Sequence, residues 1–539
     1  MKKLRYFLTK YPLTAITIVL IWYLSIWFMP PDLPINNVRF IDKWTHFVMY
    51  GGLCSVIWFE YLRRHRQLEW RKLLLLAWLA PVLMSGLIEL IQTFCTTNRA
   101  GEWLDFAANT TGATIGNLIG LAMRKLKIIP VAALLAIPLP SHAWHSVFSE
   151  QIKGLQVVLN DDFEALPVLT LGSNDVLTIG FDELSHNYHR YVYRLEPCNP
   201  DWTPVEGLFE SDWLTGFNGQ PIDDYENSIN TTVLYTHYQL RFPNSDCRPR
   251  MSGNYRLWIT DDDSGDNVVC VELRVVQPLM TVGLGITTNT DLELNGRYQQ
   301  VGMTVNYGSM RVTRPDEQIQ TIVMQNGRED NMKVNVRPDY ITPQGLRWEH
   351  NKRLIFDAGN EYHKFEVLDP THPTMGLTST RWDEASRTWH AVPTPIEQQR
   401  SYIYDEDANG AFLQRNSDNY DINRTSDYVY VHYSLKPLRE YDNTNIIIDG
   451  RWTTEDINNY IMSYDEASGT YNAVVMQKLG YYNYQLRMID YDGTTHTLPE
   501  EGSFFQTEND YQAFVYYKGT GERAWRLLAF QQVTTRAKR

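Results

Sequence analysis

The stretch GNYRLWITDDDSGDNVVCVELRVV, Gly253–Val276, decides the fold of most of this chain. Apolar residues recur at every second position from Tyr255 to Ile259 and again after the turn, a period typical of β-strands. The segment Asp261–Asp266 carries oxygen ligands for calcium but no loop-closing Glu at the right distance, so a solvated turn is the better interpretation. The stretch predicts an antiparallel hairpin with one buried face.

The same alternation continues on both sides of this hairpin, from Gly154 to the last residues. Turn clusters such as DEDANG, DEASG and DYDG separate the strands, and no long helical pattern intervenes. Short strands at regular spacing predict tandem antiparallel sandwiches of the immunoglobulin or fibronectin type. We expect three β domains with soft boundaries near Pro278 and Asp427: 151–277, 278–426 (a middle β-rich domain) and 427–539. Most of the 33 tyrosines are expected to pack in these strands rather than to form a sugar-binding surface.

The N-terminal part of the chain has a different composition. Four apolar runs have about the 20 residues that a membrane-spanning helix needs: Leu13–Met29, Trp44–Leu62, Leu73–Cys95 and Leu104–Met123. Basic residues gather before the first run, between the second and third, and after the fourth, which places those three stretches in the cytoplasm. Residues 1–127 are therefore predicted to be an all-α transmembrane four-helix unit in the inner membrane lipid.

Charge separates the two parts as well. Residues 1–130 hold 15 basic and 7 acidic residues, a balance of +8, whereas the remainder has a balance of −22. Phosphates would be repelled by the acidic part, so a nucleic-acid partner is not expected.

Between the two parts, Met123–His145 is built like a secretion signal. It has a basic flank, an apolar core of about 13 residues and a small-residue exit with Ala143 as the candidate cleavage position. Residues 128–150 are expected to be this signal-like or short transmembrane segment and a linker. Three alternatives stay open: a tether, a cleaved signal, or a second translation start at Met123. All three place residues 144–539 in the periplasm.

Polar residues recur on the predicted helices, near their outer ends. Ionisable groups at membrane depth are costly and usually pair or line a cavity. We expect either plain interhelical hydrogen bonds or a polar pocket open to the outer face, and a small-xxx-small spacing at Gly112 and Gly116 that permits close helix packing. The pocket candidates are Asp42, His46, Tyr50, Glu89, Gln92, Arg99, Asp105 and Asn109.

These residues resemble the VanZ-like membrane family over roughly residues 10–125. The shared order is Asp-Lys-x-x-His-Phe-x-x-Tyr from Asp42, Glu-x-x-Gln from Glu89, then Arg99 and Asp-x-x-x-Asn-x-x-Gly from Asp105. The resemblance implies the fold and the pocket residues, and no settled reaction.

The back part resembles the type IX secretion system plug protein of Bacteroidota, over about residues 150–535. The resemblance rests on HYQLRFPNSDCRPRMSGNYRLWITD (His237–Asp261), ITPQGLRWEHNKRLIFDAGNEYHKFEVLD (Ile341–Asp369), and the ending YNYQLRMIDYDG with TENDYQAFVYYKGTGERAWRLLAF. It implies a periplasmic protein that binds the outer-membrane translocon barrel and closes it when no substrate passes. The section near Gly450 also resembles early-set immunoglobulin modules.

No catalytic signature stands out in the back part. It contains no Gly-x-Ser-x-Gly, no His-Glu-x-x-His and no Cys/His cluster at zinc spacing, so no catalytic residue, metal or cofactor is predicted. Cys198, Cys247 and Cys270 allow one disulfide or three buried thiols. Two other functions stay open: an inner-membrane-anchored glycan-binding protein, or an envelope enzyme or antibiotic-tolerance factor in which His46 and Glu89 act on lipid-linked intermediates.

Overall fold

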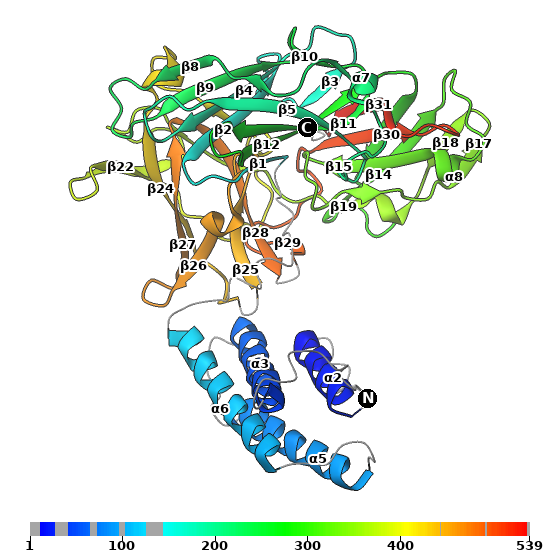
Figure 1. Ribbon diagram of the computed structural model, residues 1–539. Helices are drawn as coiled ribbons and strands as arrows, with labels where there is room; N and C mark the ends of the chain where they lie inside the picture. The colour runs from blue at the N-terminus through cyan, green and yellow to red at the C-terminus, as the bar shows by residue number, and fades with distance from the viewer. Residues whose placement is uncertain are drawn as a thin grey trace. The chain divides into compact units, whose positions relative to one another are not determined.

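The computed structural model describes residues 11–26, 41–64, 73–95, 103–125, 144–441, 444–490 and 493–535. The chain divides into two compact units, Met1–Leu139 and Pro140–Arg539 (Figure 1). The first is helical and the second consists mostly of β-sheets. A helical part followed by a β part is therefore confirmed.

Helices form on all four apolar runs of the first unit. They are α2 (Pro12–Ile26), α3 (Ile41–Arg64), the π-helical turn η2 (Leu74–Leu79) that leads into α5 (Ala80–Cys95), and α6 (Trp103–Lys125). Among the described residues, no helix combines the length and the apolar character that a membrane crossing requires.

Helices α3 and α6 pack with their backbones close together. A Cβ atom added to Gly112 would lie 2.2 Å from the carbonyl oxygen of Phe47, and one added to Gly116 would lie 2.4 Å from that of Gly51. Only glycine fits at such distances, because any side chain would overlap the facing backbone. The Gly112 and Gly116 positions thus set the spacing of this helix pair.

The first β domain, residues 144–277, is a sandwich of two sheets. Strands β11 and β12 form the hairpin predicted for Gly253–Val276, paired from Gly253↔Val275 to Thr260↔Asn267. The Asp261 carboxylate accepts hydrogen bonds from the amides of Asp263 and Ser264, which closes the turn. One sheet has the order β1-β12-β11-β5-β7 with β3 beside β12, the other β2-β4-β9-β8, and β6 pairs with β10. The elements are β1 (His145–Val147), β2 (Ile152–Leu159), β3 (Val168–Thr170), β4 (Leu177–Glu183), β5 (Tyr191–Cys198), α7 (Glu210–Trp213), β6 (Leu214–Gly216), β7 (Gln220–Pro221), β8 (Asp224–Asn227), β9 (Thr236–Phe242), β10 (Cys247–Pro249), β11 (Gly253–Asp261) and β12 (Asn267–Val276).

Residues 144–150, expected to belong to a linker, are part of this domain. Strand β1 pairs with β12 through His145↔Val271, and the Trp144 side chain is buried. An exposed linker would leave this indole in water, whereas here it packs in an apolar cluster with Met324 and Phe514. The folded part therefore begins by Trp144.

The second β domain is discontinuous in sequence. Its strands come from residues 281–357 and from the final hairpin, because β15 pairs with β30 through Ile319↔Tyr517 to Gln325↔Tyr511. One sheet runs β13-β14-β18-β17 with β19 beside β14, the other β16-β15-β30-β31. The elements are β13 (Thr281–Thr287), β14 (Tyr298–Asn306), α8 (Pro315–Gln318), β15 (Ile319–Gln325), β16 (Lys333–Val334), β17 (Tyr340–Thr342), β18 (Gly345–Trp348), η4 (Lys352–Leu354), β19 (Ile355–Asp357), β30 (Asp510–Tyr517) and β31 (Arg526–Thr534).

The third β domain, residues 360–505, is inserted between β19 and β30. Its strands follow the order β20-β28-β25-β26-β27-β24-β22-β21, with β23 and β29 beside β28, around a core that includes Phe365, Val431 and Leu486. The elements are β20 (His363–Val367), β21 (Leu377–Asp383), β22 (Thr388–Pro393), β23 (Phe412–Gln414), α9 (Ile422–Thr425), β24 (Tyr428–Leu435), β25 (Thr444–Asp449), η5 (Ile457–Tyr460), β26 (Ile461–Asp465), β27 (Thr470–Lys478), β28 (Gly480–Asp490) and β29 (Thr495–Thr497).

The expected boundary near Asp427 therefore does not separate two domains. It falls just before β24, inside the third domain, and the last strands of the chain return to the second domain. The reason is that the buried face of β30, with Tyr511, Ala513 and Val515, completes a core supplied mostly by residues 280–356. Strands that pair across so many intervening residues leave no pattern in the local sequence that would predict the pairing.

Two hairpins of the third domain repeat one sequence. WDEASRTW (Trp382–Trp389) and YDEASGTY (Tyr464–Tyr471) each place two aromatic rings across the strands, 5.4 Å and 4.9 Å apart. In each, the Asp side chain (Asp383 or Asp465) accepts a 2.6 Å hydrogen bond from the Ser hydroxyl of the turn. The left-handed position is Gly469 in one copy and Arg387, with φ 54°, in the other.

The pair provides a matched test of backbone strain. Glycine enters the left-handed region at no steric cost, whereas another residue loses about 1–2 kcal/mol there. We expect Arg387→Gly to stabilise the protein by about 0.5–1 kcal/mol after the greater freedom of the unfolded chain is counted, and Gly469→Arg to destabilise it. Urea unfolding measures both. A loss of stability in Arg387→Gly would mean that the Arg387 side chain makes contacts that outweigh the strain.

Candidate functional site

Part of the predicted helical pocket lies within the described residues. Asp42, Gln92 and Asp105 occupy α3, α5 and α6, but their side chains are outside the description, as are the whole of Arg99 and Ala143. The side chains that the structure does describe are His46, Tyr50, Glu89 and Asn109.

Three helices bring these polar groups together. Asn109 on α6 donates a 2.9 Å hydrogen bond to the Ser85 hydroxyl on α5, and Asn109, Ser85 and Tyr50 of α3 are all buried. The Tyr50 hydroxyl lies near Ser85 and the Glu89 carboxylate. Ser85 lies one helical turn before Glu89, and that spacing is the sequence signal that would have included it.

Two further polar contacts of the helical unit had no counterpart in the sequence analysis. Glu60 on α3 is buried and accepts hydrogen bonds from the amides of Leu13 (3.0 Å) and Thr14 (2.9 Å) and from the Thr14 hydroxyl (2.6 Å). A carboxylate at a helix N-terminus satisfies amides that lack partners in the helix and complements its dipole. Asn117 donates to the carbonyl of Ala77, inside the π-helical turn η2, and accepts from Trp58.

Arg274 holds the first β domain against the second. Its side chain is 1 % exposed. The guanidinium carbon lies 4.1 Å from the centroid of the Trp144 ring, 4.8 Å from that of Trp202 and 4.7 Å from that of Phe514. Its guanidinium pairs with Glu329 at 3.2 Å. A planar cation enclosed by aromatic faces and one carboxylate is a favourable way to bury an arginine.

A second buried ion pair joins the first domain to the third. Lys478 and Asp182 are 0 % and 1 % exposed at their side chains, with Nζ and Oδ2 2.6 Å apart. The Tyr428 hydroxyl donates to the same oxygen at 2.6 Å, and His237 Nδ1 lies 2.6 Å from Oδ1. Burial acts to raise the pKa of Asp182, but Lys478 and His237 outweigh it and hold that pKa below its usual value. Both oxygens of the carboxylate are thus satisfied by partners from two domains.

Removal of one partner of this pair tests the junction. Lys478→Met leaves the Asp182 carboxylate buried without its cation, for which we expect a loss of about 3–5 kcal/mol in the free energy of unfolding. The double variant Lys478→Met/Asp182→Asn should regain part of that loss. Lys436→Met, which removes an exposed cation 3.6 Å from Glu397, is the control and should change little. Equal effects of the two lysine variants would contradict this account.

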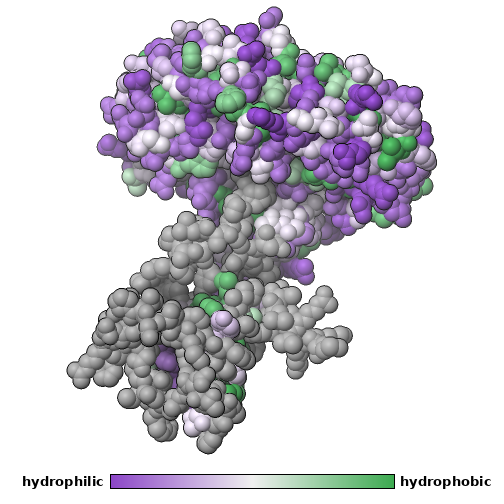
Figure 2. All heavy atoms as spheres, turned by 45° about the vertical axis from the view of Figure 1, so that its right-hand side comes forward, coloured by the Kyte–Doolittle hydropathy of each residue, from purple (hydrophilic) through white to green (hydrophobic). Residues whose placement is uncertain are grey.

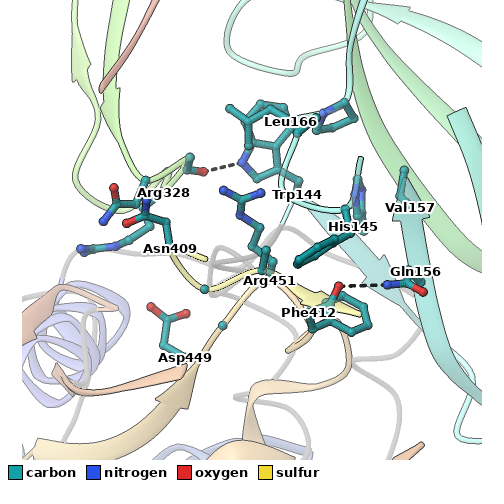
Figure 3. A pocket seen from close by; sticks show the side chains of 18 of the residues that line it. Trp144, His145, Gln156, Val157, Leu166, Arg328, Asn409, Phe412, Asp449 and Arg451 are labelled. Atoms are coloured by element: carbon teal, nitrogen blue, oxygen red, sulfur yellow. Dashed lines mark hydrogen bonds between the residues drawn. The ribbon is translucent and has the colours of Figure 1, made fainter. Parts of the chain in front are cut away.

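The three β domains meet around a cavity of about 50 Å³ (Figure 3). Trp144 donates from its indole nitrogen to the carbonyl of Gly327 at its upper edge, and Gln156 donates to the carbonyl of Phe412. The Arg451 side chain extends toward Trp144 and donates to the carbonyl of Glu164 at 2.6 Å. Burial, together with Arg451, lowers the pKa of His145 to about 3, so this imidazole is neutral.

An acidic cleft of about 380 Å³ adjoins this cavity. Burial raises the pKa of Glu361 to about 7 and that of Asp407 to about 6, and the two carboxylates repel each other. Glu361 accepts hydrogen bonds from the Tyr402 hydroxyl (2.5 Å) and the Glu508 amide (3.2 Å). The carboxylates of the cleft come from all three β domains: Asp162, Glu164, Glu361, Asp405, Glu406, Asp407, Glu508 and Asp510.

The raised pKa values predict a pH dependence of stability. Between the unfolded pKa of Glu361, about 4.5, and its folded pKa of about 7, the folded state retains a proton that the unfolded state loses. Stability is therefore highest at the acidic end and falls as the pH rises through 7, by about 2–3 kcal/mol for this group. Glu361→Gln should flatten the dependence, measured by urea unfolding at pH 5, 6, 7 and 8. The exposed Glu384→Gln is the control, and a parallel pH curve for Glu361→Gln would disprove the assignment.

Neither a metal cluster nor a disulfide stands out in the part of the chain that the structure describes. No group of three or more His, Cys, Asp or Glu side chains there is arranged to hold a metal ion. Cys198, Cys247 and Cys270 are free and buried, and burial raises the pKa of each thiol. Of the two cysteine alternatives, the structure has the three buried thiols.

Among solved structures, one match is close enough to be informative. A crystal structure of a hypothetical protein from Parabacteroides merdae ATCC 43184 is similar, with 31 % identity and a TM-score of 0.69 over 72 % of this chain and 99 % of that one. Two others have TM-scores of 0.14, too low to support an argument: the DNA glycosylase AlkC of Pseudomonas fluorescens (14 % identity, 50 % of this chain and 67 % of that one) and the C-terminal domain of AspA from Streptococcus pyogenes (8 %, 72 % and 100 %). No curated protein matches.

Two family models match, one in each unit. The VanZ/LLP1 model covers residues 4–124, which include helices α2 to α6. The model of the type 9 secretion system plug protein 1st domain covers residues 152–277, which correspond to β2 through β12 of the first sandwich. The chain is therefore a VanZ/LLP1-family segment joined to a β unit that begins with the first domain of the type 9 secretion system plug family.

Proposed function

We propose that the β unit is a non-enzymatic periplasmic plug that binds the outer-membrane translocon barrel of the type 9 secretion system and closes it. The match of the plug-family first domain to residues 152–277 carries this proposal. The remaining β domains are built onto that domain through the buried contacts of Arg274 and Lys478.

A plug must keep its shape while it covers a pore. In the β unit, each junction is a buried charged group with several partners, so domain separation would expose an uncompensated charge or an apolar cluster. On the face shown in Figure 2, hydrophilic side chains cover most of this unit and hydrophobic ones are scattered. Such a surface, with net negative charge, favours a soluble body that does not self-associate.

The VanZ-like segment is proposed to sit in the inner membrane, with no activity assigned to it. A plug at the outer membrane must then leave that anchor, by cleavage at the signal-like segment or by translation from Met123. The structure adds one constraint: a product that starts after Trp144 would lose the indole that covers Arg274. We expect a released product to begin at or before Trp144.

Fractionation of cells with a C-terminally tagged chain tests the proposal. We expect the tag in the outer-membrane fraction, co-purified with the translocon barrel, and greater outer-membrane leakage of a large hydrophilic antibiotic when residues 144–539 are deleted. Lys478→Met alters no exposed contact. It should reduce the amount of tag in the outer-membrane fraction only if binding needs the three β domains held rigidly together.

Two results would contradict the proposed plug function. Recovery of the tag only in inner-membrane fractions, with unchanged permeability of the deletion strain, would remove its support. Binding of the tagged β unit to cell-wall glycan, abolished by substitution of exposed aromatic residues, would favour the glycan-binding alternative.

A further inference from the structure

Two histidines face each other on the outward side of the third β domain. His390 is on β22 and His432 on the adjacent parallel strand β24, where His390 pairs with Tyr430. On β24, Val429 and Val431 belong to the core, so Tyr430 and His432 point away from it. His390 Nδ1 and His432 Nε2 are 2.7 Å apart.

One proton lies between these nitrogens when both rings are neutral. Burial lowers the pKa of His432, and the neighbouring His390 and Arg381 lower it further, so that ring loses its positive charge readily. Neutral imidazole nitrogens that converge in this way are the donors that divalent zinc, copper and nickel prefer, whereas calcium and magnesium prefer oxygen.

The far side of His390 is arranged to hold the required tautomer. Its Nε2 lies 3.3 Å from the Thr388 hydroxyl and 3.4 Å from the Ser386 hydroxyl, and Asp383 accepts a 2.6 Å hydrogen bond from Ser386. A proton on Nε2 therefore has acceptors, which leaves the Nδ1 lone pair free to face His432. Metal-binding histidines almost always donate their other N–H to such a group.

We propose that His390 Nδ1 and His432 Nε2 bind a divalent transition-metal ion on this face of the third domain, with water in its remaining coordination positions. Bonds of about 2.0–2.1 Å in a tetrahedral shell require the nitrogens to lie about 3.3 Å apart. The rings separate by roughly half an ångström, a change that side-chain rotation on a sheet surface allows. The Tyr430 ring, stacked on His390 with centroids 5.5 Å apart, keeps that imidazole oriented.

The test is calorimetric titration of the untagged full chain in detergent with Zn²⁺ and, separately, with Cu²⁺. We expect one saturable site per chain, weakened at least tenfold in His390→Gln and in His432→Gln, and weakened less in Asp383→Asn. Binding should vanish near pH 5, because protonated imidazoles do not bind metals. His350→Gln and His372→Gln remove histidines with 62 % or more of the side chain exposed and are the matched controls.

Spectroscopy separates loss of the ligands from loss of the fold. Electron paramagnetic resonance of the Cu²⁺ complex should show two nitrogen donors in the wild type and one in each single variant, while urea unfolding of the variants stays unchanged. The absence of saturable binding in the wild type, or binding in both histidine variants as tight as in the wild type, overturns the proposal. Its outcome is independent of the plug function.

Discussion

The Asp182 carboxylate is the constraint on which the architecture of the β unit depends. It lies on β4 of the first domain, fully buried, and its nearest cation, Lys478, comes from the end of β27 in the third domain. Neither charge can remain buried without the other, so the two domains can separate only if both ions are returned to water together. Arg274 imposes a similar condition between the first and second domains, through the Glu329 carboxylate, the Tyr516 hydroxyl and the aromatic rings around it.

Local patterns predicted the strands but not their assembly. The alternation from Gly253 to Val276 predicts β11 and β12 correctly, because alternate residues of both strands enter the core of the first domain: Tyr255, Leu257, Ile259, Val269, Val271, Leu273 and Val275. The same alternation places Arg274 on the outward face, which would ordinarily be solvated. It is buried because the second domain covers that face, and the covering residues Phe514 and Tyr516 come from the end of the sequence. Lys478 is missed for the same reason.

In the helical unit, the spacing of residues predicted a helix contact but not the hydrogen-bond partners. The interval between Gly112 and Gly116 predicts a close helix contact, and in the structure both positions face the backbone of α3. Residues at i and i+4, such as His46 and Tyr50, share a helix face whatever they bind. The choice of Ser85 as the partner of Asn109, or of Glu60 as the acceptor for the first amides of α2, depends on how separate helices meet and has no signature within either one.

The insertion of the third domain into the second has a consequence for synthesis on the ribosome. Strand β15 cannot find its neighbour β30 until nearly two hundred further residues have been made, and its apolar edge stays open for that whole interval. The domains with contiguous strands can fold meanwhile, so the middle of the chain becomes the last region to close. An incomplete chain that stops before Asp510 is thus left with an unpaired, aggregation-prone strand, so a truncation anywhere in the last part of the chain exposes a strand far from the missing residues.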